Sequence, residues 1–215
     1  NMRCIARTIT TNTNNTEEDV YSLLNDRNYL NELIKEYWFI DESILNQNIY
    51  YSLEGYLFPN TYQYMNKDVS VKDIFKSMLD EMNEQLSIYK NELLNSGHSI
   101  HELLTLASIV ELEGTANSDR AGIAGVFFNR LNDGWSLGSD VTTYYAEQIE
   151  MSERDLWQYE IDEVNDYNTR PAAMAGKLPV GPISNPSSLS IKAALEPREE
   201  EYFYLRGSVD GEKSL

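Results

Sequence analysis

Apolar residues recur at helical spacing through most of the 215-residue chain, which predicts a series of separate helices. The clearest pattern covers 99–113, where Ser99 followed by Glu102 forms a capping box and Gly114 ends the run. We expect one face of this helix to be buried, because its apolar residues fall three and four positions apart. The residues of that face are Leu103, Leu106, Ala107 and Val110.

Other segments carry weaker patterns. Residues 1–15 are rich in Thr and Asn, and we expect an edge strand or a frayed segment there. Residues 202–205, which read Tyr-Phe-Tyr-Leu, predict a strand. The chain is therefore expected to have an α+β fold, mostly helical with short strands. Further helices that begin at Ser, Thr or Asp caps are predicted over about 16–36, 42–46, 70–94, 118–131, 142–145 and 188–195.

Two carboxylates, Glu111 and Glu113, lie at the end of the 99–113 helix, on opposite flanks of its apolar face. Burial beside apolar side chains removes water from a carboxylate and raises its pKa toward a value that suits proton transfer. The alternative is that both are solvated charges at a helix end, because most carboxylates are surface groups. The pattern alone leaves both interpretations open.

The composition excludes several kinds of binding partner and of metal or disulfide site. The formal net charge is -18, so the chain repels nucleic acid and anionic lipid surfaces, and no nucleic-acid partner is expected. The single cysteine, Cys4, excludes an internal disulfide and a multi-cysteine zinc site. His98 and His101 lack the spacing of metal ligands and are expected to be surface or capping residues. We predict neither a metal nor a cofactor, and no apolar run reaches the ~18 residues of a membrane span.

Five short motifs follow one another along the chain. They are Leu-Glu-Gly-Tyr-Leu-Phe-Pro-Asn-Thr-Tyr at 53–62, Leu-Ala-Ser-Ile-Val-Glu at 106–111, Phe-Phe-Asn-Arg-Leu at 127–131, Ser-Asp-Val-Thr at 139–142 and Leu-Pro-Val-Gly-Pro-Ile-Ser-Asn-Pro at 178–186. In this order they resemble the motifs of the endolytic murein transglycosylases, the YceG-like family. One such motif is weak evidence, whereas five in the family's order are strong evidence.

The resemblance implies a helical catalytic domain with short strands over 51–215, and a groove built from 53–62, 139–142 and 178–186. It also implies a small LysM-like module over 1–50. The opening strand of that module has a poor pattern here, so we expect the module to be truncated or replaced. A single membrane anchor is expected ahead of these residues, with the catalytic domain on the extracytoplasmic side.

The implied activity is lytic transglycosylation of peptidoglycan. The bond between N-acetylmuramic acid and N-acetylglucosamine is cleaved, and the strands are left with 1,6-anhydromuramic ends. The glutamate after Ser-Ile-Val, Glu111, is implied to act as general acid and then as base, with Glu113 as a neighbouring charge. Glycan strands are the expected partner, and peptidoglycan synthases are candidate partners. Substrate-binding roles are implied for Glu54, Tyr62, Ser139, Asp140, Thr142, Asn168 and Asn185. Two of these residues have alternative roles: Glu54 could support the catalytic glutamate or pair with the backbone of a tight loop, and Asp140 could cap the helix over 142–145.

The chain departs from the family's motifs at several positions. Gly138 and Val141 stand where the family has Gln and Pro, and Arg170 follows Tyr-Asn-Thr in place of Tyr. These departures keep open a second hypothesis, a glycan-binding or scaffold protein of the same fold without turnover. A hydrolase with a nucleophilic serine or cysteine is poorly supported, because no Gly-x-Ser-x-Gly motif occurs and Cys4 lies far from the other motifs.

Overall fold

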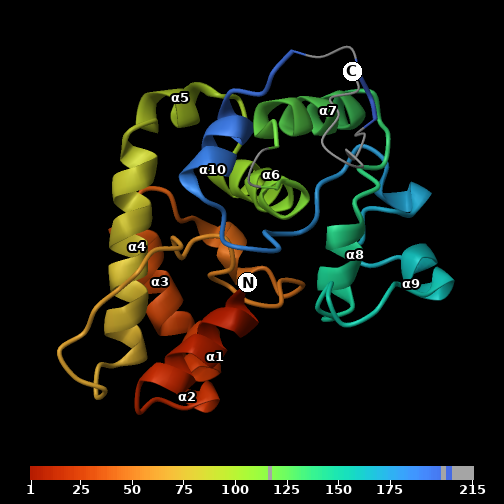
Figure 1. The fold of residues 1–215 in the computed structure, drawn as a ribbon. Coiled ribbons are helices and arrows are strands. Elements are labelled where there is room, and N and C mark those ends of the chain that lie inside the picture. The colour runs from red at the N-terminus through yellow and green to blue at the C-terminus, as the bar shows by residue number, and fades with distance from the viewer. Residues whose placement is uncertain (116–117, 200–201, 205–215) are drawn as a thin grey trace.

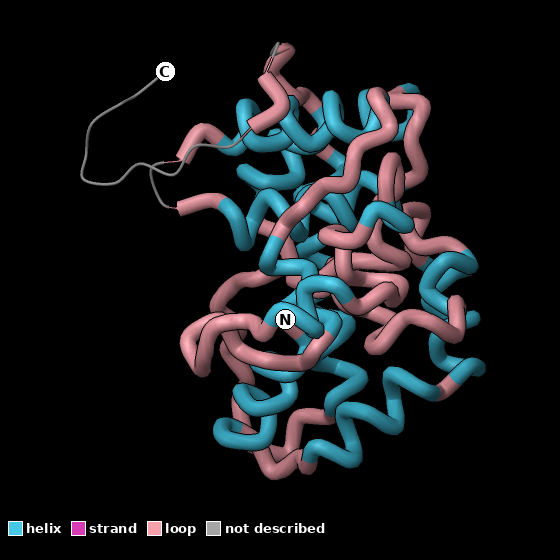
Figure 2. The backbone as a smooth tube through the Cα atoms, turned by 90° about the vertical axis from the view of Figure 1, so that its right-hand side faces the viewer, coloured by secondary structure: helices cyan, strands magenta, loops and turns pink. Residues whose placement is uncertain are grey.

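The computed structural model describes residues 1–115, 118–199 and 202–204, and every regular element in those ranges is a helix. Figure 2 shows the described backbone as helices joined by loops. The prediction of a mostly helical chain is confirmed, whereas the predicted strands are not found in these ranges. Residues 202–204 form no regular element, and Leu205 lies outside the described residues.

The first helix, α1 (Met2–Asn12), occupies the segment that was expected to be a strand or frayed. Its buried residues Met2, Ala6 and Ile9 are spaced four and three apart, and the Asn1 side chain caps the helix by accepting from the Cys4 N–H. This apolar spacing outweighs the low helix propensity of the Thr and Asn residues between, because packing decides over propensity.

The rest of 1–50 is also helical, with α2 (Glu17–Asn25), α3 (Arg27–Glu36) and the 3₁₀ helix η1 (Glu42–Leu45). The single helix predicted over 16–36 divides at Asp26, whose carboxylate caps α3 by accepting from the N–H groups of Asn28 and Tyr29. No strand is found in residues 1–50, so the opening strand of a LysM-like module is not part of this region.

The remaining helices form a central group with further helices on either side of it (Figure 1). The α4 helix runs along one side, α6, α7 and α10 pack together, and α8 and α9 lie on the side away from α4. The helix predicted over 70–94 is interrupted before Lys90 and forms two helices. The bounds are α4 (Val71–Ser87), α5 (Lys90–Asn95), α6 (Ile100–Glu113), α7 (Arg120–Asn132), α8 (Asp140–Ala146), α9 (Gln158–Asp162), η2 (Ala172–Met174) and α10 (Ser188–Leu195).

The α6 helix begins at the predicted capping box of Ser99 and Glu102 and ends at Gly114. Its burial is more complete than the pattern indicated, because every residue from 100 to 110 except Glu102 is buried. A helix enclosed on all sides is a core helix, and α7, α8 and α10 pack around this one. The end of α6 is therefore held rigidly, together with the two glutamates that it carries.

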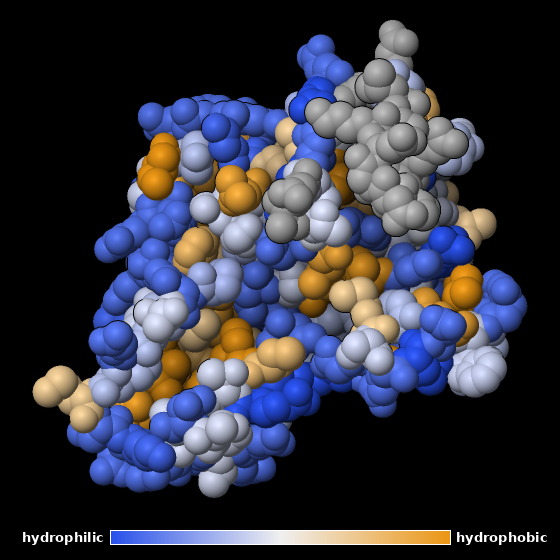
Figure 3. All heavy atoms as spheres, viewed as in Figure 1, coloured by the Kyte–Doolittle hydropathy of each residue, from blue (hydrophilic) through white to orange (hydrophobic). Residues whose placement is uncertain are grey.

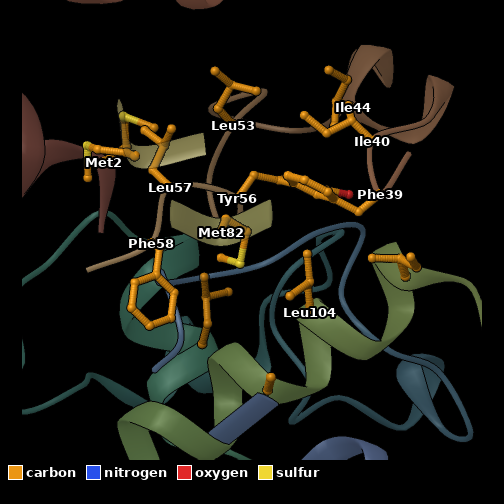
Figure 4. Packing of buried hydrophobic residues seen from close by; sticks show 14 of the residues in the cluster. Met2, Phe39, Ile40, Ile44, Leu53, Tyr56, Leu57, Phe58, Met82 and Leu104 are labelled. Carbon is orange, nitrogen blue, oxygen red and sulfur yellow. The ribbon is translucent and has the colours of Figure 1, made fainter. Parts of the chain in front are cut away.

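Irregular backbone at 53–58 lies in the core and connects the N-terminal helices to the rest (Figure 4). The rings of Phe39 and Tyr56 stack with centroids 6.5 Å apart, and Leu53 and Leu57 are fully buried. Residues 1–50 thus share one hydrophobic core with the later helices. No helix among the described residues combines the length and apolar character needed to cross a membrane.

Candidate active site

Glu111 is half-buried near the end of α6 and points toward the start of α10. Its Oε2 accepts from the Ser187 N–H at 3.0 Å, from Ser187 Oγ at 2.6 Å and from Ser190 Oγ at 2.6 Å. Burial alone would raise the pKa of Glu111, but these hydrogen bonds and the positive charge of Arg120 together outweigh burial, and the pKa lies below its ordinary value. The expectation of a raised pKa at this glutamate is therefore wrong.

Glu113 reaches a different element from Glu111, as their opposite flanks on the helix predicted. Its Oε1 accepts from Ser139 Oγ at 2.5 Å. Ser139 is buried and stands directly before α8, and its backbone N–H donates to Thr169 Oγ1 at 3.2 Å. The two glutamates thus join α6 to α10 and to α8 respectively.

Thr142 and Asn168 belong to a buried polar network behind α8. Thr142 Oγ1 donates to the Ser139 carbonyl at 2.6 Å, and the Asn168 amide donates to three carbonyls at the end of α9, including that of Glu163 at 2.7 Å. Both side chains are fully buried. Since they expose no surface to a glycan, the predicted direct sugar contact does not fit their geometry, and they fix the loops around α8 instead.

Asp140 is the exposed member of the 139–142 motif. Its carboxylate lies 3.2 Å from the guanidinium of Arg170, which also donates to the Gly138 carbonyl at 3.2 Å. The alternative role of Asp140 as the cap of this helix is wrong, because Ser139 holds that position and Asp140 lies in the first turn. The departure from the family at Arg170 therefore creates an ion pair at the surface.

Glu54 and Asn185 join the 53–62 and 178–186 segments. Glu54 is fully buried, and its carboxylate accepts from the Met2 N–H at 2.7 Å and from Asn185 Nδ2 at 2.9 Å. Burial raises the pKa of this carboxyl. Asn185 Oδ1 in turn accepts from the backbone N–H groups of Gly55 at 2.8 Å and Leu57 at 3.1 Å. The predicted sugar contact by Glu54 does not fit its burial, whereas Asn185 is partly exposed.

His101 is buried between the same two segments, so the prediction of a surface or capping residue is wrong. Its Nε2 lies 2.9 Å from the Val180 carbonyl and its Nδ1 lies 2.7 Å from the Tyr56 hydroxyl. A carbonyl only accepts, so Nε2 carries the proton and Nδ1 accepts from Tyr56. Further along α6, Ser108 Oγ accepts from the Ile183 N–H at 3.0 Å. His101 and Ser108 are polar residues inside an apolar helical run, and this pattern was the sequence signal that could have predicted their contacts with the 178–186 segment.

Comparison with models of known protein families assigns almost the whole chain to one family. The family model described as "YceG-like family" matches residues 2–214. The chain belongs to the YceG-like family.

Relatives of this family member carry a functional name. A Bacillus subtilis (strain 168) protein named endolytic murein transglycosylase is 38% identical over 210 residues, which cover 97% of this chain and 57% of the relative. A Streptococcus pneumoniae (strain R6) protein of the same name is 31% identical over 201 residues, or 90% of this chain and 35% of the relative. The chain thus spans between a third and three fifths of the length of these curated relatives.

A solved structure supports the fold. The 2.6 Å crystal structure of a yceG-like protein from Listeria monocytogenes matches with a TM-score of 0.88 and 32% identity, and the match covers 97% of this chain and 67% of that one. The helical arrangement around α6 is therefore shared with a family member of known structure.

A groove of about 800 Å³ lies between α1, the segment before α4 and the first half of α4. Figure 3 shows apolar surface gathered in this hollow, at the lower left of the view. Two predicted site residues, Tyr62 and Asn185, line it together, whereas neither Glu111 nor any residue of 139–142 does. This groove is therefore not the one predicted from 53–62, 139–142 and 178–186. Tyr62 is half-buried and its hydroxyl donates to the Phe58 carbonyl at 2.8 Å. Among the described residues, no group of three or more His, Cys, Asp and Glu side chains is arranged to hold a metal ion.

Proposed function

We propose that this YceG-like chain has the activity for which its curated relatives are named, endolytic murein transglycosylation. The substrate would be the glycan strand of peptidoglycan, cleaved between N-acetylmuramic acid and N-acetylglucosamine to leave 1,6-anhydromuramic ends. The observation that carries the proposal is the position of Glu111. This carboxylate ends the 106–111 motif on a rigid core helix, is partly exposed, and has one oxygen held by donors from α10.

The proposed reaction needs one carboxyl group. Protonated Glu111 gives its proton to the glycosidic oxygen as the bond from that oxygen to C1 of the muramic residue breaks. The resulting carboxylate then takes the proton of the muramic C6 hydroxyl, whose oxygen bonds to C1 and closes the 1,6-anhydro ring. Hydrolytic glycosidases usually need a second carboxylate to act as nucleophile or to activate water. Here the C6 hydroxyl replaces both, so Glu113 serves to hold α8 through Ser139.

The predicted substrate-binding residues form two sets, one with partly or fully exposed side chains and one with buried side chains. Asp140, Tyr62 and Asn185 keep partly or fully exposed side chains and are proposed to contact sugar hydroxyls. The buried predicted residues hold the loops that carry them. These buried residues are Glu54, Ser139, Thr142 and Asn168.

The substrate also sets the expected location, because peptidoglycan lies outside the cytoplasmic membrane. We propose an extracytoplasmic position at the cell membrane, and peptidoglycan synthases stay predicted partners. Residues 1–50 are proposed to support a catalytic domain over 51–215. The hydrogen bonds from Tyr37 to Asp80 and from Trp38 to Asn83 support this, since they tie the two parts together.

The proposal is tested by incubating the protein with purified glycan strands in ¹⁸O-labelled water and analysing the products by mass spectrometry. We expect anhydro products, one water lighter than reducing-end products and free of label. Labelled reducing ends would indicate a hydrolase instead. Strands that bind but are not cleaved would favour the glycan-binding or scaffold alternative.

A further inference from the structure

Ser187 stands at the N-cap position of α10 but makes no cap hydrogen bond with its side chain. A serine at this position ordinarily accepts from a backbone N–H one turn into the helix. Here Ser187 Oγ donates to Glu111 Oε2 at 2.6 Å, and its backbone N–H donates to the same oxygen at 3.0 Å. The Ser187 side chain therefore binds Glu111 and does not cap α10.

Ser190, one turn further along α10, is fully buried and makes the third contact to Glu111 Oε2, at 2.6 Å. Its hydroxyl oxygen accepts from Arg120 Nε at 3.1 Å. Arginine has donors only, so this contact directs the Ser190 proton away from Arg120 and onto the glutamate. The positive charge of Arg120, on α7, also favours the ionised form of Glu111.

All contacts to Glu111 converge on one oxygen. Within the described residues no donor reaches Oε1, and the other carboxylate at this helix end, Glu113, is turned to Ser139. We propose that Ser187, Ser190 and Arg120 are positioning residues that hold Glu111 by Oε2 and reserve Oε1 for proton exchange with the glycan. This inference rests on the proposed function for its catalytic meaning.

The assignment gives each oxygen a separate task. The Oε1–H bond breaks as the glycosidic oxygen receives the proton and separates from C1. The same Oε1 recovers a proton from the C6 hydroxyl as the C6 oxygen bonds to C1, so Glu111 ends in its starting form. Three donors on Oε2 stabilise the carboxylate that exists between the two steps. This favours proton donation to the glycosidic oxygen and lowers the pH above which the acid form is lost.

The hydrogen-bonding claim is tested by carbon-detected NMR titration of the Glu111 carboxyl in the parent protein and in Ser187→Ala, Ser190→Ala and Ser188→Ala. Ser188 is the matched control, since it lies between the other two on α10 and its hydroxyl bonds to no described residue. Loss of either donor should raise the titration midpoint of Glu111 by about one pH unit. The control should leave the midpoint unchanged. Equal midpoints in all four proteins would overturn the inference.

The catalytic meaning is tested by the pH dependence of kcat/KM for release of anhydro products. In Ser187→Ala the alkaline limb of the pH profile of kcat/KM should move to higher pH by the same amount as the NMR midpoint of Glu111. Ser187→Thr keeps a hydroxyl and should restore the profile of the parent protein. A fall in rate at every pH with no movement of the limb would show a merely structural role and overturn the inference. If the NMR midpoints move but the parent releases no product at any pH, the proposed function fails while the oxygen-holding contacts stand.

Discussion

Asn185→Ala removes the side chain that joins the two motif segments next to the proposed site. Asn185 Oδ1 accepts from the N–H groups of Gly55 and Leu57, and Nδ2 donates to the buried carboxylate of Glu54. Both N–H groups belong to buried residues, so the alanine variant leaves two donors and a carboxylate short of partners. We therefore expect Asn185→Ala to lower the free energy of unfolding. Removing an asparagine amide that contacts only the substrate would not do so.

The magnitude follows from the unpaired groups. A buried donor left without an acceptor is unfavourable by about 1–3 kcal/mol. Two such donors at the partly exposed Asn185 site, where water can reach some of the space, give a loss of about 2–4 kcal/mol in the free energy of unfolding. For a chain of this size each kcal/mol moves the melting temperature by roughly 2–4 °C, so the expected fall is about 5–15 °C.

Thermal and urea denaturation of the variant and of an Asn60→Ala control measure this loss. Asn60 is exposed and its amide oxygen accepts only from the adjacent Thr61 N–H, at 2.8 Å. A third variant, Asn185→Asp, keeps the acceptor but sets a second carboxylate beside Glu54, whose pKa burial already raises. The native state then binds more protons than the unfolded chain, so this variant should lose stability as the pH rises above about 4. An Asn185→Ala loss within about 0.5 kcal/mol of the control would refute the reasoning.

Two further predictions concern other contacts. Gly55→Ala should destabilise the protein far more than Gly97→Ala, although both glycines have positive φ, of 87° and 81°. Of these two, only Gly55 has a neighbour that the new Cβ would clash with, the ring of Pro182, so equal losses in denaturation midpoint would contradict this. The hydrogen bond from Arg154 lowers the pKa of Glu160 to about 2, so this pair contributes stability above the unfolded pKa of about 4.5 and loses it as the pH falls toward 2. Denaturation midpoints of Arg154→Ala between these pH values should show a shallower acid dependence than the parent, and an unchanged slope would argue against the pair.

Local signals in the sequence located the central helix. The capping box at Ser99 and the stop at Gly114 placed α6 within a residue of its observed bounds, because these signals act within one turn. The α1 helix was missed, because Thr and Asn composition hid the spacing of its three buried apolar residues. Propensity is a weak guide wherever tertiary packing supplies most of the stability of a helix.

The position of Glu111 could be predicted from its motif, but its surroundings could not. Ser187 lies 76 residues away along the chain, and nothing local distinguishes a serine that caps its helix from one that binds a distant carboxylate. The direction of the pKa shift depends on those distant donors, whose effects together exceed the effect of burial, and burial was the one effect that the local sequence indicated. The pairing of Glu54 with Asn185 was hidden for the same reason, as the two residues lie 131 positions apart.

Release of 1,6-anhydromuramic products by Glu111→Gln and Glu113→Gln tests the central claim most directly. Glutamine keeps the shape of the side chain but has no proton to transfer, so Glu111→Gln should slow release by at least about 100-fold. Glu113→Gln should be milder, because the amide oxygen can still accept from Ser139. Near-normal release by Glu111→Gln together with loss in Glu113→Gln would contradict the assignment of the acid and base to Glu111.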